Sequence, residues 1–264
     1  MTSPDATLPI GVFDSGVGGL TVLRALRAAL PGEDFLYFGD TARVPYGSKP
    51  PALVRQFAWE ISGFLLRKGV KAIVVACNTA SSVALPDLAA SLSVPVYGVL
   101  EPAVAAALRV EGRVGLIGTE TTVQSGAYQA RLARAGRAVW ARPCPLFVPL
   151  VEEGLWEDGV ARLVVAHYLK DAPKDLSALI LGCTHYPYLK PVIAEVLPGV
   201  QLIDSAEVTA RVVAEGLEAR GLRNPEGAGR VVHFVTGDPG TYRVLANRLG
   251  EAAGEVHKVE LGEL

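Results

Sequence analysis

The sequence has little cysteine, little net charge and no long apolar run, and each of these shortages excludes a class of protein. Its three cysteines include no CxxC pair, which argues against a disulfide framework, a zinc ribbon and a thioredoxin-type redox pair. A formal charge of −2 supplies no broad positive field, so we expect neither nucleic acid nor a membrane as partner. No run approaches the roughly 18 apolar residues of a membrane span, and residues 1–9 lack the features of a secretory signal. These absences predict a cytoplasmic protein with reduced cysteines that acts on a small molecule.

What the sequence has in abundance is short apolar runs rich in β-branched residues. Glycine, proline or aspartate bounds most of these runs, which is typical of buried strands in a parallel sheet. Between them, Leu53, Phe57, Ile61 and Leu65 recur at helical spacing and predict a helix over residues 51–68. The alternation predicts an α/β fold whose strands span residues 9–13, 35–38, 72–76, 94–98, 114–118, 178–181 and 231–235.

The length and the absence of a flexible linker bear on domain organisation. With 264 residues, half of them hydrophobic and 20% charged, the chain can form one large or two small globular domains. No Ser/Gly-rich tract separates two halves, so two domains must share a close interface. A new helix begins within residues 97–102, and another is capped by Asp-Ser-Ala-Glu at residues 204–207. If both positions are boundaries, a discontinuous first domain comprises residues 1–98 plus 208–264, and the second comprises residues 99–207.

Two segments that contain cysteine echo each other. Residues 71–81 read KAIVVACNTAS and residues 177–187 read SALILGCTHYP, each an apolar strand followed by a cysteine and a predicted helix start. Ligands bind at the carboxyl ends of parallel strands, and the free amides of a helix N-terminus favour a thiolate there. A single buried cysteine is usually a small apolar residue, but two in matching contexts, Cys77 and Cys183, indicate a shared function. Cys144 lies between two prolines without such a context, and we interpret it as structural.

Two thiols that do not form a disulfide suit one particular reaction. If they flank the α-carbon of an amino acid, one removes its proton while the other supplies a proton to the opposite face. A pair of groups of the same type works in both directions. His185, two residues after Cys183, could stabilise a thiolate or relay its proton, and Asp14 could play the matching part for Cys77.

A glycine-rich turn follows the first predicted strand, in the sequence GVFDSGVGGLTVLRAL at residues 11–26. As a dinucleotide fingerprint it is incomplete, because Thr21 stands where the third glycine belongs and Asp14 would lie beside a pyrophosphate. No Gly-Lys-Ser/Thr follows, which excludes a P-loop. The alternatives are that Asp14 and Ser15 hold a small zwitterion, or that they simply cap a turn.

A second polar loop, YFGDTARVPYGSKP at residues 37–50, follows the next strand. Loops at the carboxyl edge of a sheet commonly serve a site, so Tyr46 could supply a hydroxyl and Gly47 a backbone amide to a substrate carboxylate. An ordinary Pro/Gly turn explains the same residues. Glu152 and Glu153 are expected at a solvated helix end unless one of them turns inward.

The motifs DSGVGGL, VPYG, ACNTAS and GCTHYP occur in this order, with CPLFVPLVEEG at residues 144–154. Between residue 10 and about residue 207 the sequence thereby resembles the glutamate racemases of the cofactor-independent aspartate/glutamate racemase superfamily. The resemblance implies two similar α/β domains, each a mainly parallel sheet flanked by helices, with the active site in the cleft between them. It implies interconversion of L- and D-glutamate without pyridoxal phosphate or metal, supply of D-glutamate for peptidoglycan, and a homodimer.

The resemblance also assigns residues, by matching motif. It implies that Cys77 and Cys183 are the two acid/base residues, with Cys77 on the D-glutamate side and Cys183 on the L-glutamate side. Glu153 matches an acidic residue near the site. The positions that match substrate contacts are Asp14, Ser15, Tyr46, Gly47, Asn78, Thr79, Thr184 and His185.

Three alternatives remain at the level of sequence. An aspartate racemase, or another two-cysteine isomerase of the superfamily, shares the architecture. A cysteine hydrolase built on Cys183 and His185 would form a covalent acyl-enzyme. A nucleotide-binding protein without catalytic activity would use the glycine-rich turn and tolerate substitution of both cysteines.

Overall fold

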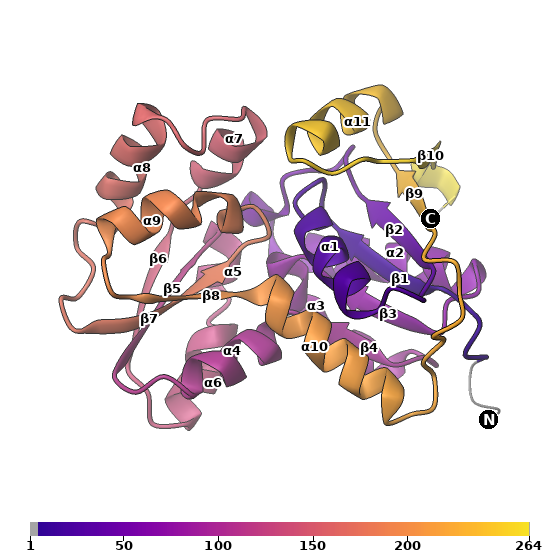
Figure 1. Ribbon diagram of the computed structural model, residues 1–264, viewed down its shortest axis with the longest axis horizontal. Helices are drawn as coiled ribbons and strands as arrows, with labels where there is room; N and C mark the ends of the chain where they lie inside the picture. Colours follow the sequence, from indigo (N-terminus) through magenta and orange to yellow (C-terminus); the bar gives the residue numbers. More distant parts are fainter. Residues whose placement is uncertain (1–4, 264) are drawn as a thin grey trace.

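The structure is a computed structural model that describes residues 5–263, and its strands form two parallel sheets side by side (Figure 1). The first sheet has the order β10-β9-β2-β1-β3-β4 and the second the order β6-β5-β7-β8. The strands of the first are β1 (Ile10–Asp14), β2 (Phe35–Gly39), β3 (Ala72–Val75), β4 (Val96–Gly98), β9 (Val231–Val235) and β10 (Glu255–Lys258). Those of the second are β5 (Arg113–Gly118), β6 (Val139–Pro143), β7 (Leu176–Gly182) and β8 (Gln201–Asp204). The predicted α/β class is therefore confirmed.

The seven predicted strands all form, and the three that the sequence did not reveal share a position. β6, β8 and β10 each lie at an edge of a sheet. Their sequences VWARP, QLID and EVHK are only partly buried, so they carry no continuous apolar run. Central strands such as β1 and β3 are buried along their whole length, which is why their apolar runs are visible in the sequence.

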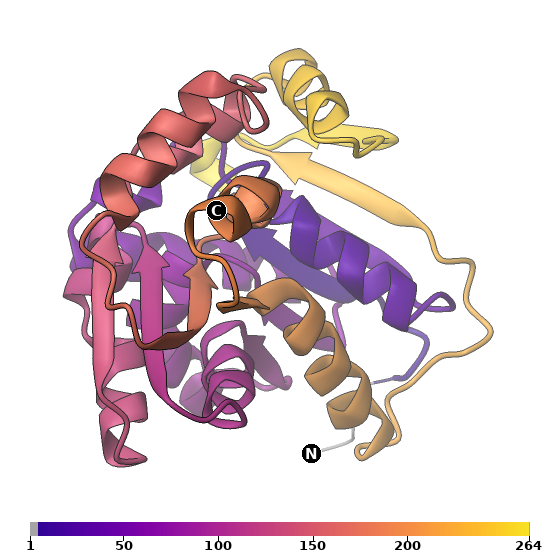
Figure 2. The same cartoon turned by 60° about the vertical axis from the view of Figure 1, so that its left-hand side comes forward.

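Helices cover both faces of each sheet, and the predicted helix at residues 51–68 forms as α2. α10 lies beside α1, as Figures 1 and 2 show, and also contacts α4. The helices are α1 (Leu20–Ala29), α2 (Pro51–Arg67), α3 (Asn78–Ser91), α4 (Leu100–Leu108), α5 (Glu120–Gln124), α6 (Ala127–Arg134), α7 (Phe147–Glu152), α8 (Gly159–Leu169), α9 (Lys190–Val196), α10 (Ser205–Glu218) and α11 (Pro239–Arg248). Short 3-10 turns are η1 (Tyr46–Ser48), η2 (Tyr186–Leu189) and η3 (Leu261–Glu263).

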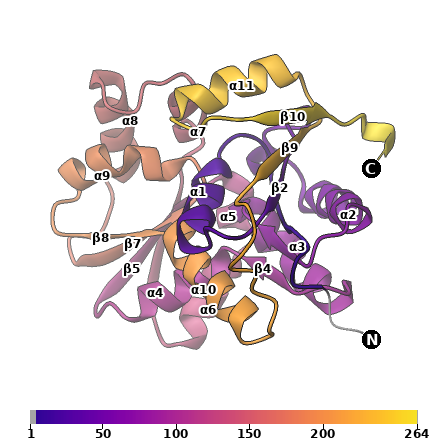
Figure 3. The same cartoon turned by 45° about the vertical axis from the view of Figure 1, so that its right-hand side comes forward.

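The two sheets share one hydrophobic core rather than being joined by a tether. A single cluster of buried side chains includes Val12 of β1, Leu181 of β7, Leu26 of α1 and Val213 of α10. Because α10 follows β8 of the second sheet and packs on α1 of the first, it brings the two sheets together. Figure 3 shows the chain returning from α10 to β9, so the first sheet is built from both ends of the chain. The boundaries at residues 98/99 and 207/208 stay a prediction.

None of the helices in residues 5–263 is long and apolar enough to cross a membrane. The part of the fold that matters for function is where the carboxyl ends of β1, β3 and β7 meet, because both predicted cysteine segments end there.

Candidate functional site

The first half of the site is built on the ends of β1 and β3. Asp14 is the last residue of β1, and Cys77 follows β3 by two residues and precedes α3. Cys77 has an extended backbone and its Sγ accepts a hydrogen bond from the backbone N–H of Ala80 at 3.5 Å. The thiol thus caps the N-terminus of α3, as the sequence predicts, and Cys77 is only 5% exposed.

The second half is built on the end of β7. Gly182 lies so close to β5 that a Cβ there would stand 2.8 Å from the carbonyl oxygen of Ile117, which only glycine avoids. Cys183 follows it and is 7% exposed. Its Sγ lies 3.8 Å from Nδ1 of His185, whose Nε2 lies 3.0 Å from Oε1 of Glu152. A thiol, an imidazole and a carboxylate therefore form a row.

One local prediction for this second half is wrong. The sequence predicts a helix start after each cysteine, but Cys183 is followed by the short turn η2, and the α-helix α9 begins only at Lys190. Proline explains the difference. Pro191 has no N–H and is tolerated only in the first turn of an α-helix, so α9 cannot begin much earlier. The thiol of Cys183 therefore faces the imidazole of His185 and not the N-terminus of an α-helix.

The two halves have opposite electrostatics. Burial disfavours the cationic form of His185, but hydrogen bonds and charge interactions with Cys183 and Glu152 prevail and raise its pKa to about 10. Burial, reinforced by the neighbouring carboxylate of Asp14, raises the pKa of Cys77 to about 12. Burial also raises the pKa of Asp14, against the charge of His185 and backbone N–H groups. At neutral pH, His185 is a cation beside Cys183, and Cys77 is a neutral thiol. The prediction that helix amides favour a thiolate is therefore wrong for Cys77, because burial outweighs the hydrogen bond from the N–H of Ala80.

The halves are in contact, which the sequence alone does not show. Thr21 Oγ1 donates a hydrogen bond to the carbonyl oxygen of Thr184 at 3.1 Å, and Thr184 Oγ1 donates to Asp14 Oδ1 at 3.5 Å. A Cβ at Gly18 would stand 2.4 Å from Thr184 Oγ1, so the close approach requires glycine. The charge of Cys183 also contributes to the raised pKa of Cys77. The two thiols therefore belong to one site.

One of the two predicted contacts from the 37–50 loop, the hydroxyl of Tyr46, is engaged within the protein. The hydroxyl of Tyr46 is not free for a substrate, because it donates a hydrogen bond to the buried carboxylate of Asp40. Asp40 also accepts from Thr236 Oγ1 at 2.8 Å and from Arg43 Nε at 2.7 Å. Tyr46 thus anchors the loop, and the backbone of the loop remains as the group that can face a ligand.

Gly47 and Thr79 both lie against Thr119, which belongs to the side of the second sheet. A Cβ at Gly47 would stand 2.5 Å from Cβ of Thr119. The hydroxyls of Thr79, Thr119 and Thr122 form a triangle with sides of 2.9, 3.1 and 2.8 Å. Thr119 also caps the N-terminus of α5, so its position is fixed from its own side. No motif in the sequence marks Thr119 or Thr122.

The remaining first-half contacts surround Cys77. A side-chain hydrogen bond from Ser15 reaches Cys77 and lowers the pKa of that thiol, against the larger effect of burial. Asn78 is 2% exposed and donates from Nδ2 to Tyr128 Oη at 2.7 Å. Cys144 is fully buried in the core. Its Sγ lies 3.7 Å from the carbonyl oxygen of Arg142, and the structure assigns it no part in the site.

The carboxylate that the structure brings to the site is Glu152, not Glu153. The side chain of Glu153 is 72% exposed and lies 3.7 Å from Arg248 Nη1. Glu152 is the last residue of α7 and Glu153 caps the helix, so their side chains leave it about 100° apart. Only Glu152 turns inward to His185. The assignment of Glu153 near the site is therefore corrected to Glu152.

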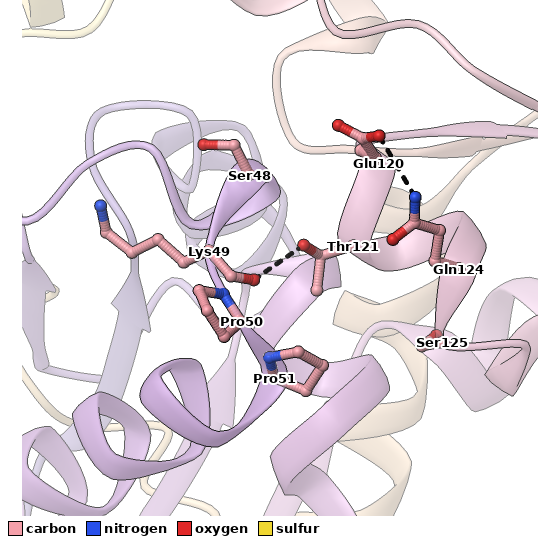
Figure 4. A pocket seen from close by; sticks show the side chains of 8 residues that line it. All are labelled: Ser48, Lys49, Pro50, Pro51, Glu120, Thr121, Gln124 and Ser125. Carbon is pink, nitrogen blue, oxygen red and sulfur yellow. Dashed lines mark hydrogen bonds between the residues drawn. The ribbon is translucent and has the colours of Figure 1, made fainter.

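An open groove of about 510 Å³ lies farther out on the same interface, between the loop after Gly47 and α5 (Figure 4). Thr121 Oγ1 donates a hydrogen bond to the carbonyl oxygen of Lys49 at 2.9 Å across its floor. The ammonium of Lys49 points away from Glu120 in this view. Neither thiol lines this groove. The hydrogen bond between Thr121 and Lys49 joins the side of the second sheet to that of the first.

The described residues offer little to a metal or an aldehyde cofactor. Within residues 5–263 no three His, Cys, Asp or Glu side chains gather as metal ligands would. The buried Lys71 forms an ion pair with Glu33. It precedes β3, whereas Cys77 follows that strand, so its ammonium lies at the opposite end from the site.

The chain is similar to known proteins over nearly its whole length. The profile of the Asp/Glu/hydantoin racemase family matches residues 10–213. A glutamate racemase of Thermus thermophilus is 70% identical over 260 residues, which is 98% of this chain and 99% of that relative. The crystal structure of the Thermus thermophilus glutamate racemase in complex with β-chloro-D-alanine superposes with a TM-score of 0.95 at 69% identity, covering 98% of this chain and all of that one.

A more distant structure shows the same fold with a natural ligand. The glutamate racemase of Francisella tularensis, crystallised with D-glutamate, has a TM-score of 0.92 at 36% identity, covering 98% of this chain and all of that one. Its agreement extends over both sheets, not only over the cysteine motifs. With a family profile across most of its length and a relative 70% identical from end to end, this chain belongs to the Asp/Glu/hydantoin racemase family, among its glutamate racemases.

Proposed function

We propose that the chain interconverts L- and D-glutamate by a two-base 1,1-proton transfer between Cys183 and Cys77, without a cofactor. The observation that carries the proposal is that two buried thiols, from two different sheets, meet in one site with different proton partners. Asp14 accompanies Cys77, and His185 with Glu152 accompanies Cys183. A hydrolase would need one thiol and one histidine, so it leaves the second buried thiol and its carboxylate unexplained.

Reaction from L-glutamate begins at Cys183. The imidazolium of His185 stabilises the Cys183 thiolate, which takes the α-proton, and the electron pair of the broken C–H bond stays on the α-carbon. The neutral thiol of Cys77 then donates its proton to the opposite face and becomes a thiolate. Reaction from D-glutamate runs through the same steps in reverse, with Asp14 available to receive the proton that Cys77 must lose and the imidazolium of His185 available to protonate Cys183.

The binding of glutamate uses the segments that surround the thiols. We assign the two carboxylates to backbone amides at the start of α3 and in the loop of Tyr46 and Gly47, where developing negative charge is also stabilised. The proposed contacts are Asp14, Ser15, Tyr46 through its backbone, Gly47, Asn78, Thr79, Thr184 and His185. Because Cys77 and Cys183 are almost inaccessible, the two sheets must separate for glutamate to enter, and their closure removes water from the reaction.

The setting of the reaction follows from the family. We place the protein in the cytoplasm, where it supplies D-glutamate for peptidoglycan, and we propose that it forms a homodimer. Sedimentation or light scattering at several protein concentrations measures the oligomeric state. A monomer at all concentrations would contradict the dimer and leave the proposed chemistry intact.

Proton NMR in deuterated buffer tests the activity. L-glutamate, D-glutamate and, as a control, L-aspartate are each incubated with the reduced protein, a chelator and no pyridoxal phosphate. We expect loss of the α-proton signal together with loss of optical rotation for both glutamate enantiomers. Exchange with aspartate instead would indicate an aspartate racemase. Absence of exchange with all three amino acids would overturn the proposal.

A further inference from the structure

A buried amide beside Cys77 has one end satisfied and the other end free. Nδ2 of Asn78 donates to Tyr128 Oη at 2.7 Å and to Ser205 Oγ at 3.4 Å. Oδ1 of Asn78 is buried and has no hydrogen-bond partner in the part of the chain that the structure describes. An unpaired buried acceptor is unfavourable, so its presence next to a catalytic thiol points to a ligand that supplies the donor.

Two hydroxyls determine which end of the amide stays free. The hydroxyl of Ser205 donates to the carbonyl oxygen of Leu181 at 3.1 Å, so toward Tyr128 it can only accept. Oη of Tyr128 and Oγ of Ser205 both lie within hydrogen-bond distance of Nδ2 of Asn78, and Ser205 Oγ is the neighbouring acceptor for the single proton of Tyr128. The oxygen of Tyr128 therefore accepts from Asn78, and the amide must turn its NH2 group to Tyr128. Burial raises the pKa of Tyr128, so this hydroxyl keeps its proton.

This chain of hydrogen bonds links the two catalytic segments. It starts at Asn78, directly after Cys77, and ends at Leu181, two residues before Cys183. Tyr128 comes from α6 and Ser205 begins α10, so both hydroxyls belong to the side of the second sheet. Tyr128 is fully buried and Ser205 is 5% exposed. The orientation of a group on the first sheet is thus determined from the second.

We propose that Tyr128 and Ser205 are positioning residues that hold Oδ1 of Asn78 toward the α-ammonium group of the substrate. The inference rests on the proposed function, since it requires an amino acid between Cys77 and Cys183. An ammonium group has donors and no acceptor, so it matches a carbonyl oxygen and would be repelled by the NH2 end of the amide. Either carboxylate of glutamate would be repelled by Oδ1. The two hydroxyls therefore make the site select amino acids over dicarboxylic acids that lack the amine.

The substitution Tyr128→Phe tests this, because it removes the hydroxyl and keeps the ring. We measure KM and kcat for both enantiomers of glutamate, and the inhibition constant of glutarate, which is glutamate without its amine. We expect KM for glutamate to rise about tenfold, the scale of one hydrogen bond to a charged group. The inhibition constant of glutarate should stay within about twofold, since glutarate makes no use of Oδ1.

Three further variants separate positioning from simple stability. Ser205→Ala should shift the ratio of KM for glutamate to the inhibition constant of glutarate in the same direction, and Ser205→Thr should restore it. Tyr97→Phe is the matched control, because Tyr97 also has a buried hydroxyl, one with no hydrogen-bond partner among residues 5–263, and lies against Gly216 rather than the site. It should leave both constants unchanged.

Two results would overturn the inference. One is an equal rise of both constants in Tyr128→Phe, which would mean that the hydroxyl only supports the fold. The other is no change in either constant. Calorimetric binding of glutamate and glutarate to the same variants gives the comparison without turnover. If the wild-type protein binds glutamate but does not racemise it, the proposed chemistry fails while the role of Tyr128 and Ser205 can still be judged.

Discussion

The two halves of the site each hold a buried thiol, in contrasting surroundings. Burial raises the pKa of the Cys77 thiol to about 12, and the neighbouring carboxylate of Asp14 adds to this effect. Cys183 lies beside the imidazolium of His185, whose pKa is raised to about 10. The reaction we propose is symmetric between enantiomers but uses an asymmetric pair of thiols. The difference keeps the proton on Cys77 at rest.

This asymmetry also determines which enantiomer the resting protein is ready to accept first. With Cys77 protonated and Cys183 paired with a cation, the protein is ready to take the α-proton of L-glutamate. The form that accepts D-glutamate requires Cys77 to lose its proton first. Because enantiomers have equal free energy, kcat/KM must nevertheless be equal in the two directions. Any test of the asymmetry must therefore use a quantity other than the ratio of these constants.

Removal of either thiol should have the largest effect. Cys77→Ala and Cys183→Ala should each reduce racemisation by about 100- to 10,000-fold or more, the range for a positioned acid or base. The assay is circular dichroism of either enantiomer. Cys144→Ala is the control and should retain activity, because Cys144 is a buried core residue whose Sγ lies 3.7 Å from the carbonyl oxygen of Arg142. Near wild-type turnover in either catalytic variant would disprove the two-base mechanism.

Substitution of the partner groups should reveal the asymmetry itself. His185→Gln and Asp14→Asn should each lower kcat/KM about 10- to 100-fold, and equally in both directions. Removal of His185 makes proton abstraction by Cys183 slower, so the primary deuterium isotope effect should rise most with α-deuterated L-glutamate. Removal of Asp14 should produce the mirror image, with the larger rise for D-glutamate. Equal isotope effects for both enantiomers in both variants would contradict the pairing of each partner with its own thiol.

The sequence shows the central strands and both cysteines, because burial on two faces and matched strand ends leave clear patterns. It does not show the edge strands β6, β8 and β10, whose partly solvated faces allow mixed composition. The approach of Thr184 to Asp14 depends on the packing of α10 against α1, a contact distant in sequence that no local pattern encodes.

The sequence also does not show in which direction individual side chains point. The motif VPYG indicates the loop of Tyr46 but not that Asp40 takes up its hydroxyl. Tyr128 and Ser205 lie outside every motif, since a single hydroxyl that orients an amide leaves no periodic signal. Glu152 and Glu153, at the end of α7, differ only in the direction in which each side chain leaves the helix. The sequence locates a helix end only to within one or two residues, so it does not show which of the two points inward.

The two glutamates provide the next test of the second half-site. Glu152→Gln should lower kcat/KM by about 3- to 10-fold, because the imidazolium loses its charged partner while a hydrogen-bond acceptor remains. Glu153→Gln is the matched control, and its activity should match that of the wild type, since the exposed Glu153 contacts only Arg248 within the described residues. The reverse order of effects would restore Glu153 to the site and contradict the orientation of α7.

A second buried histidine sharpens the comparison. His233 on β9 hydrogen-bonds to the hydroxyl of Tyr242 at 2.9 Å, and its ring contacts Tyr37. Tyr37 in turn donates to the carbonyl oxygen of Gly16, in the loop that follows Asp14. Burial, together with the charges of nearby arginines, lowers the pKa of His233 to about 4. Both histidines are buried, but only His185 has a thiol and a carboxylate to hold its charge.

The neutral His233 predicts an effect on stability rather than on turnover. Its pKa is lower in the folded than in the unfolded protein, so its contribution is fully present above about pH 6.5 and is lost as the pH falls toward 4. The loss should be on the order of 3 kcal/mol by pH 4. His233→Gln keeps a polar partner for Tyr242 and does not titrate, so its free energy of unfolding should fall less than that of the wild type over this range. Urea denaturation at pH 7, 5.5 and 4.5 measures the difference, and parallel curves for the two proteins would show that His233 does not remain neutral in the fold.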